Sequence, residues 1–316
     1  MCSAAVETMA YARSGGVPWH GLGFAVNDDL TPEEMQIAAG LDWKVETVPI
    51  YLGNGKQIAD NYAIVRSTDN RVLSLCGKRF VPTQNENVFE FFKEYVSAAQ
   101  ASMETAGSLH DGREIWALAK LNEGFSVWGD RVEGYLFLAN SHKPGTTLRV
   151  GICLTRIVCM NTLMMGEDEA KGNGNYYRFY HSRQFTPKIQ ERVKEEMGIA
   201  RHQIEHFKHQ AEVLARFQMN EKLAVNTVIN VFGKPDEKEV DQPRVVGKIM
   251  DLFEGQAIGA DMRSANGTAW GLLNATTEYL DHHAGRGVDT RLHSAWMGNG
   301  AQKKLKMFNQ LIKLAA

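Results

Sequence analysis

The sequence predicts an α+β protein, with an antiparallel β-hairpin and meander plus helices in its first half and a mostly helical C-terminal half. Two observations predict this class. Short segments between residues 43 and 154 alternate apolar with polar residues, which is the period of β-strands. From residue 187 onward, apolar residues recur every three or four positions. Because strands come first and helices follow, we expect α+β rather than alternating α/β architecture.

Length and composition narrow the class of protein further. The chain of 316 residues is 44% hydrophobic and carries a net charge of only −2, which is typical of a folded globular protein and not of a disordered one. No apolar run approaches the roughly 20 residues that span a bilayer. The four cysteines show neither CxxC pairing nor a disulfide spacing, and they are Cys2, Cys76, Cys153 and Cys159. We therefore expect a cytoplasmic protein that does not contact membranes.

The first predicted helix begins after a loop that contains several glycines. Thr31 suits the N-cap, Pro32 the first helical position, and the acidic Glu33 and Glu34 the positive end of the helix. A second helix is expected from Asn85 or Asn87, each of which suits an N-cap. The predicted strands cover residues 43–52, 62–66, 72–75, 114–121, 135–140 and 147–154, and a tight turn is expected at Gly53–Gly55 after the first of them.

The residue composition and the spacing of apolar residues change after the last of these strands. A helix is expected to start near Thr155, and residues 166–175 are polar and glycine-rich. Residues 187–232 indicate a long charged helix, and helices dominate the remainder. We therefore expect three regions: an α+β core domain at 1–165, a polar loop, strand and long helix at 166–235, and a helical C-terminal region at 236–316.

Several ordered segments carry a family resemblance. They are Pro18–Gly23, Phe80–Asn85, Thr155–Leu163, His181–Ser182 and Thr268–His282. On these segments the chain is identified as a member of the phage- and plasmid-encoded proteins catalogued as domain of unknown function nine-three-two. The resemblance implies a phage, prophage or plasmid setting and carries no settled activity.

A second resemblance concerns the order of elements. A hairpin, a helix, a three-stranded meander and another helix are similar to the core of phage single-strand annealing proteins of the RecT, Red-beta and Erf kind. That likeness implies a homo-oligomer, as a ring or filament, that holds single-stranded DNA along a basic groove without a cofactor. The apolar side chains of Ile249, Leu252 and Phe253 either pack against a neighbouring copy or belong to the core of the chain itself.

A segment rich in aromatic and basic residues supports nucleic-acid binding. In Tyr176–Arg183, rings that stack on bases stand beside cations that track phosphates. If the segment is extended, Arg178, Tyr180 and Ser182 face one way, whereas Tyr177, Phe179, His181 and Arg183 face the other. An ordinary strand with a polar outer face is the alternative. With the basic end of the chain, the candidate DNA-binding residues are Arg149, Arg156, Tyr177, Arg178, His181, Arg183, Arg263, Lys303 and Lys304.

Two other functions stay open. His202, Glu205 and His206 match the HxxEH pattern, in which two histidines at i and i+4 hold zinc and the glutamate acts as a base, so a metal-dependent hydrolase is one alternative. His282, oriented by a carboxylate such as Asp281 or Glu278, is a further candidate base or metal ligand, with a buried structural network as the commoner outcome. The other alternative is a phage accessory protein that binds or inhibits a host protein. We assign no catalytic residue.

Overall fold

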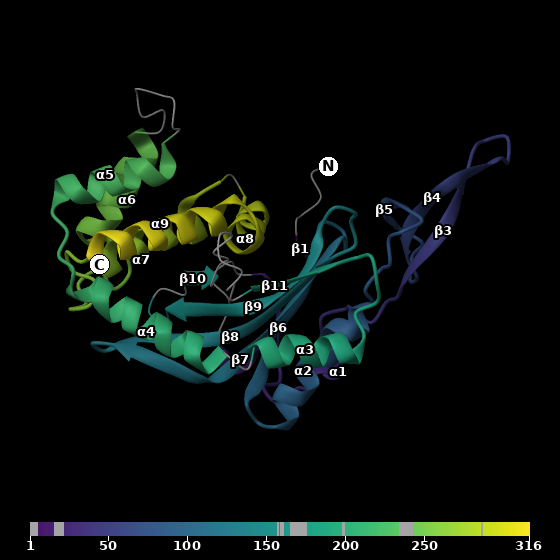
Figure 1. Cartoon of the computed structure of the whole chain (residues 1–316), viewed down its shortest axis with the longest axis horizontal. Helices are drawn as coiled ribbons and strands as arrows, with labels where there is room; N and C mark the ends of the chain where they lie inside the picture. Colours follow the sequence, from purple (N-terminus) through teal and green to yellow (C-terminus); the bar gives the residue numbers. More distant parts are fainter. Residues whose placement is uncertain are drawn as a thin grey trace. The chain divides into compact units, whose positions relative to one another are not determined.

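The computed structural model confirms the α+β class (Figure 1). It describes residues 6–15, 22–156, 158, 161–164, 176–197, 200–233, 243–285 and 287–316. The chain forms two compact units. The first comprises Met1–Asn122, Tyr135–Ile152 and Gly174–Gly198, and the second comprises Glu123–Gly134, Cys153–Asn173 and Ile199–Ala316.

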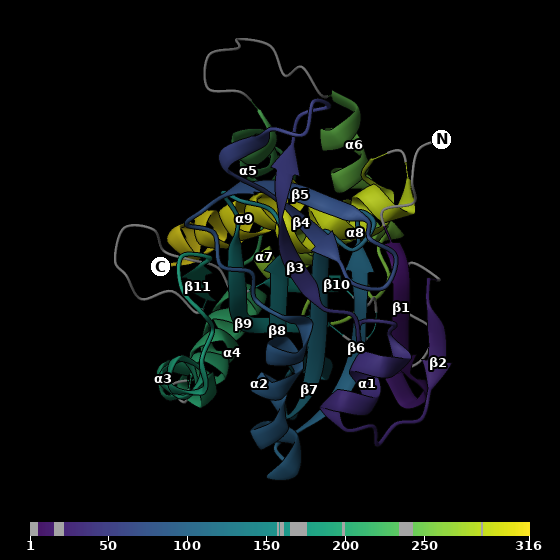
Figure 2. The same ribbon diagram turned by 90° about the vertical axis from the view of Figure 1, so that its right-hand side faces the viewer.

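The larger sheet has the strand order β10-β9-β8-β7-β6-β1-β2, and β11 pairs with β9. Figure 2 shows the part of this order from β9 to β2. Strands β1 and β2 are parallel, whereas β1 and β6, β6 and β7, β9 and β10, and β9 and β11 are antiparallel. The strands are β1 (Val6–Ala12), β2 (Phe24–Val26), β6 (Ala101–Leu109), β7 (Glu114–Val127), β8 (Asp130–Ser141), β9 (Thr147–Arg156), β10 (Asn161–Met164) and β11 (Tyr176–Tyr180). The predicted strands at 114–121, 135–140 and 147–154 are confirmed.

The prediction of a helix near Thr155 is wrong. Strand β9 continues through Arg156, and Thr155 lies opposite Thr162 of β10 in an antiparallel ladder. The physical reason is local composition: Val150, Ile152 and Thr155 are β-branched residues, which favour extended backbone when a neighbouring strand supplies hydrogen bonds. Arg156 therefore lies at the end of a strand.

A smaller three-stranded sheet belongs to the first unit. It contains β3 (Val45–Tyr51), β4 (Gln57–Arg66) and β5 (Val72–Gly77), in the order β3-β4-β5. The predicted turn between β3 and β4 is confirmed, with a hydrogen bond of 2.8 Å from the amide of Gly55 to the carbonyl of Leu52. Pairing between β4 and β5 ends at Asn61, so the β3–β4 hairpin extends past β5 (Figure 1).

Three helices belong to the first unit: α1 (Pro32–Ala38), α2 (Asn85–Ser97) and α3 (Pro187–Met197). The predicted start of α1 is confirmed, because Thr31 and Glu34 form a reciprocal capping box. Neither predicted asparagine caps α2, whose N-cap is Gln84. The side-chain amide of Asn85 instead donates to the carbonyls of Leu41 at 3.1 Å and Trp43 at 3.3 Å, so buried tertiary bonds replace a local cap.

The second unit is built on helices. They are α4 (Ala200–Arg216), α5 (Glu221–Phe232), α6 (Pro243–Asp251), α7 (Ala269–Glu278), α8 (Val288–Met297) and α9 (Asn299–Ala315), with π-helical turns at Leu252–Gln256 and Tyr279–His283. The predicted helical stretch at 187–232 is three helices, since Asn220 caps a new one by accepting from the amide of Leu223 at 2.9 Å. No helix of the described residues is long and apolar enough to cross a membrane.

Helix α7 lies at the centre of the second unit. All ten of its residues are buried, and it packs against α4 and α9. Of the apolar residues for which two roles were left open, Ile249 and Leu252 are also buried, at 0% and 1% exposure. These two side chains therefore belong to the core of their own chain rather than to a surface for a neighbouring copy.

Candidate nucleic-acid interface

The basic and aromatic strand β11 presents one open face. Arg178 lies directly opposite Arg149 of β9, and Tyr180 lies opposite Thr147. Arg178 and Tyr180 are exposed, the latter by 66%, whereas Phe179 between them is only 2% exposed. The predicted alternation is therefore confirmed for these residues. We call Thr147, Arg149, Arg178 and Tyr180 the β11 surface.

The β11 surface brings two guanidinium groups together. Like charges directly opposite each other on a sheet repel, so the register of Arg149 and Arg178 is electrostatically unfavourable on its own. An anion that accepts hydrogen bonds from both groups reverses that repulsion. Both arginines also interact with other groups of the protein. The β11 surface therefore combines two guanidinium groups with an exposed phenol ring.

The opposite face of β11 holds the strand in place. The ring of Phe179 packs 5.3 Å from that of Phe185, which in turn lies 6.4 Å from Phe91 of α2. The exposed Arg183 places its guanidinium 5.5 Å from the centre of the Phe179 ring. Tyr177, opposite Val150, is half-buried on this same face. These contacts fix the strand and leave Arg178 and Tyr180 on the other side.

His181, a predicted DNA-binding residue, is a buried anchor. It is 6% exposed, and its carbonyl accepts a hydrogen bond of 2.8 Å from the amide of Val81. Its ring lies 5.0 Å from Phe80 and 3.5 Å from the hydroxyl of Thr83. Burial lowers the pKa of His181 to about 4, so the ring is neutral near pH 7 and offers no charge to a phosphate.

A second buried histidine, His142, lies in the same unit and is not among the site residues predicted from the sequence. His142 Nε2 is 3.1 Å from Asn85 Oδ1, and its ring packs edge-on against Trp43. Burial, and then the proximity of His181, lower the pKa of His142 to about 3. Among the described residues, His142 Nδ1, His181 Nε2 and Asn140 Oδ1 are buried without a hydrogen-bond partner. Buried polar atoms of this kind are commonly satisfied by internal water.

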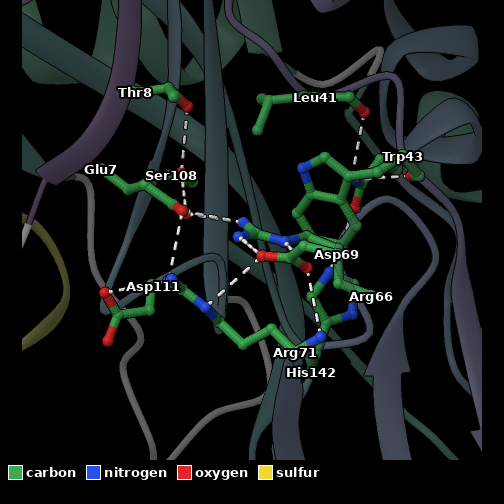
Figure 3. Close-up of polar contacts among 11 residues, drawn as sticks. Glu7, Thr8, Leu41, Trp43, Arg66, Asp69, Arg71, Ser108, Asp111 and His142 are labelled. Carbon is green, nitrogen blue, oxygen red and sulfur yellow. Dashed lines mark hydrogen bonds and ion pairs between the residues drawn. The ribbon is translucent and has the colours of Figure 1, made fainter.

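A network of five charged residues joins the two sheets of the first unit (Figure 3). Arg66 donates to both carboxylate oxygens of Glu7, at 2.9 and 2.8 Å, and pairs in a bidentate manner with Asp69. Arg71 lies 3.4 Å from Glu7 and 3.2 Å from Asp111. The hydrogen bonds with Arg66 hold the pKa of Asp69 well below its usual range. Because these charges are paired with one another, we interpret the network as stabilising the fold and not as a binding site.

The other predicted basic residues lie in the second unit. Arg263 is exposed, with its guanidinium 5.2 Å from the centre of the Trp128 ring. Lys303 is half-buried and holds its ammonium 4.6 Å from the centre of the Phe232 ring. The side chain of Arg156 lies outside the part of the chain whose side chains are described.

Lys304 is not a surface residue. Its side chain is fully buried, and its ammonium lies 2.6 Å from the equally buried carboxylate of Asp281. Lys306 donates to the carbonyl of Asn230 at 2.8 Å, near the C-terminal end of α5. Part of the basic end of the chain therefore serves the packing of helices. Asp281, a candidate to orient His282, pairs with Lys304 in a buried ion pair, which fits the structural network expected as the commoner outcome.

The HxxEH pattern lies on α4. Glu205 and His206 are exposed, and the carboxylate of Glu205 lies 3.5 Å from Lys208. The side chain of His202 falls outside the described residues. A catalytic zinc site requires ligands held by shielded neighbours. The two described members of the pattern have the surroundings of a solvated helix face.

Comparison with known proteins yields a family and no characterised relative. No curated protein and no solved structure matches the chain. A match to the family described as Domain of unknown function (DUF932) covers residues 72–296, which is most of the chain. That region includes the whole of the β11 surface and both buried histidines. The chain therefore belongs to the family Domain of unknown function (DUF932).

Proposed function

We propose that the protein binds single-stranded DNA through the β11 surface and acts as a homo-oligomer in strand annealing, in recombination or replication of a phage or plasmid. The observation that carries the proposal is the register of β9 and β11. It sets Arg149 beside Arg178 on an open face, next to a tyrosine that is 66% exposed.

The chemistry of this surface favours a single strand over a duplex. Guanidinium groups pair with phosphates of either form. A ring that lies on a sheet, however, stacks only on a base whose face is free, and unpaired bases offer that face. Tyr180 supplies the ring, and Arg149 and Arg178 supply the cations. Stacking and backbone contacts together give binding that tolerates any sequence, as annealing requires.

The low net charge of −2 sets a condition on this proposal. Because the chain as a whole does not attract a polyanion, the affinity has to come from local cations. Arg149 and Arg178, in direct register, are two such cations. Binding is therefore expected to be moderate in strength and sensitive to the loss of either arginine.

Self-association is supported by an apolar row on the smaller sheet. Val48, Ala63 and Leu75 lie directly opposite one another across β3, β4 and β5. The two outer side chains are 37% and 62% exposed. Exposed apolar rows on a sheet mark sites of protein contact. If the purified protein binds no DNA, this row favours the alternative in which the protein binds a host protein.

The experiment compares two variants that each lose one positive charge. Fluorescence anisotropy with a labelled oligothymidylate of about 20 nucleotides measures the affinity. Arg178→Gln is expected to weaken binding about tenfold, since a hydrogen bond to a charged group contributes on the order of 1.5 kcal/mol. Lys78→Gln removes an exposed lysine that pairs with Asp60 and is expected to bind like the wild type. Equal affinities for both variants contradict the proposal.

A further inference from the structure

Trp128 differs from the other tryptophans of the described residues. It is 39% exposed, whereas Trp43, Trp116, Trp270 and Trp296 are each no more than 8% exposed. It lies with Gly129 in the two-residue turn that joins β7 to β8. A large ring that remains in contact with solvent at the tip of a hairpin is available to a ligand.

The backbone at Trp128 is unfavourable for a tryptophan. Its φ is 50°, and that of Gly129 is 92°, so both residues of the turn adopt left-handed conformations. Turns of this kind favour asparagine, aspartate and glycine, because a bulky side chain is disfavoured at positive φ. The turn alone gives no reason for an indole at this position. The outlier points to a role for the ring itself.

Arg263 orients the ring from one side. Its exposed guanidinium lies 5.2 Å from the centre of the indole, in a cation–π contact. A buried cluster fixes both partners. Asp130, which is 0% exposed, accepts hydrogen bonds from Trp270 Nε1 at 2.9 Å and from the hydroxyl of Ser264 at 3.2 Å. Because Asp130 follows the turn and Ser264 follows Arg263, this cluster holds the hairpin tip and the arginine together.

From this arrangement we infer that Trp128 and Arg263 form a stacking site for an unpaired nucleobase. The indole stacks on the base, and the guanidinium contacts the adjoining phosphate. The inference rests on the proposed function and adds a contact point in the second unit. A ring and a cation that are already positioned lose little conformational freedom when the ligand binds, which favours affinity.

The decisive variant is Trp128→Asn. Asparagine suits the left-handed turn, so we expect the melting temperature to hold or to rise while the stacking ring is lost. Anisotropy compares an oligothymidylate of about 20 nucleotides with an abasic phosphate backbone of the same length. The variant is expected to bind the oligothymidylate about 5- to 150-fold more weakly, and the abasic backbone like the wild type.

Tryptophan emission gives a second readout of the same site. Oligothymidylate is expected to quench wild-type emission, and subtraction of the Trp128→Asn signal isolates the quenching that arises at this ring. Phe24→Asn, which removes an aromatic ring that is 53% exposed on β2, is the control and is expected to bind like the wild type.

The possible failures are distinguishable. If Trp128→Asn binds oligothymidylate as tightly as the wild type and emission does not change, the stacking site is overturned while binding through the β11 surface stands. If Arg178→Gln has no effect but Trp128→Asn weakens binding, the β11 surface is wrong and the stacking site is supported. If the wild-type protein binds no oligonucleotide, both are overturned.

Discussion

At the scale of single residues, basic side chains play different roles in different surroundings. Lys304 and Arg178 were both predicted to contact DNA because both are basic. Lys304 is fully buried against Asp281, whereas Arg178 is exposed beside Arg149. The sequence shows which residues are charged. Whether such a residue is buried depends on which face of its helix or strand packs against the rest of the protein. A basic residue on an amphipathic helix such as α9 therefore needs the structure to be assigned.

The buried ion pair gives a prediction on stability. Lys304→Met is expected to lower the free energy of unfolding by about 3–5 kcal/mol, because it leaves the carboxylate of Asp281 buried without its partner. Urea denaturation measures the loss. The double variant Lys304→Met with Asp281→Leu is expected to recover much of it, since no charge is then left uncompensated. Lys313→Met, at an exposed position, is the control, and a loss as large in the control contradicts the account.

The two buried histidines give a prediction on pH. Burial lowers the pKa of His142 from 6.5 to about 3 and that of His181 from 6.5 to about 4. Below about pH 6.5 the unfolded chain therefore binds protons that the folded chain does not, so stability is full above that pH and falls with acidification until the folded histidines protonate. By about pH 5 the loss is on the order of 2 kcal/mol for each histidine.

Urea denaturation at about pH 7 and about pH 5 tests the predicted loss of stability on acidification. His142→Gln cannot titrate, and its loss between the two pH values is expected to be about half that of the wild type. A variant that loses as much stability on acidification as the wild type would show that His142 is not the group responsible.

At the scale of elements, patterns that are local in sequence were predicted and pairings that depend on distant partners were not. The capping box of α1 and the turn of the β3–β4 hairpin are local, and both are confirmed. Strand β6 was missed because its sequence, ASMETAGSL, has small residues and weak strand preference. Its place is set by β7: a Cβ on Gly107 would lie 2.4 Å from the ring of Trp116, so only glycine fits.

In helix α7, a glycine-to-alanine substitution is predicted to destabilise the protein, although alanine favours helices more than glycine does. Alanine usually stabilises a helix relative to glycine by about 1 kcal/mol. At Gly271 an added Cβ would lie 1.9 Å from the carbonyl oxygen of Ala265, so Gly271→Ala is expected to lower the melting temperature. Gly247→Ala in α6 has no atom within 4 Å and is expected to raise it. Thermal denaturation of the two variants tests the packing of α7, and a rise for both contradicts it.

At the scale of the whole molecule, part of the candidate site was predictable. The alternation of Arg178 and Phe179 follows from the period of a strand, and the structure confirms it. The partner of Arg178 could not be deduced, because strand register depends on the turn and on packing rather than on either strand alone. Trp128 escaped notice for another reason: its sequence surroundings look like an ordinary turn, and only its exposure and positive φ set it apart.

The apolar row of the smaller sheet gives a prediction on assembly. Leu75→Thr keeps a residue that favours strands but lowers the apolar area of a side chain that is 62% exposed. If the row mediates self-association, multi-angle light scattering is expected to show a smaller average mass for this variant than for the wild type. Ile258→Thr, at a residue that is 52% exposed outside the sheet, is the control. A wild-type protein that is monomeric with and without oligonucleotide contradicts the proposed assembly.

The central claim is that Arg149 and Arg178 neutralise phosphates of a single strand. The measurement that tests it most directly is the slope of the logarithm of the binding constant against the logarithm of salt concentration. Each neutralised phosphate contributes about −0.7 to the slope for single strands. The double variant Arg149→Gln with Arg178→Gln is therefore expected to show a slope shallower by about 1.4 than that of the wild type. A wild-type affinity that does not change with salt, or a slope that is the same in both proteins, contradicts the claim.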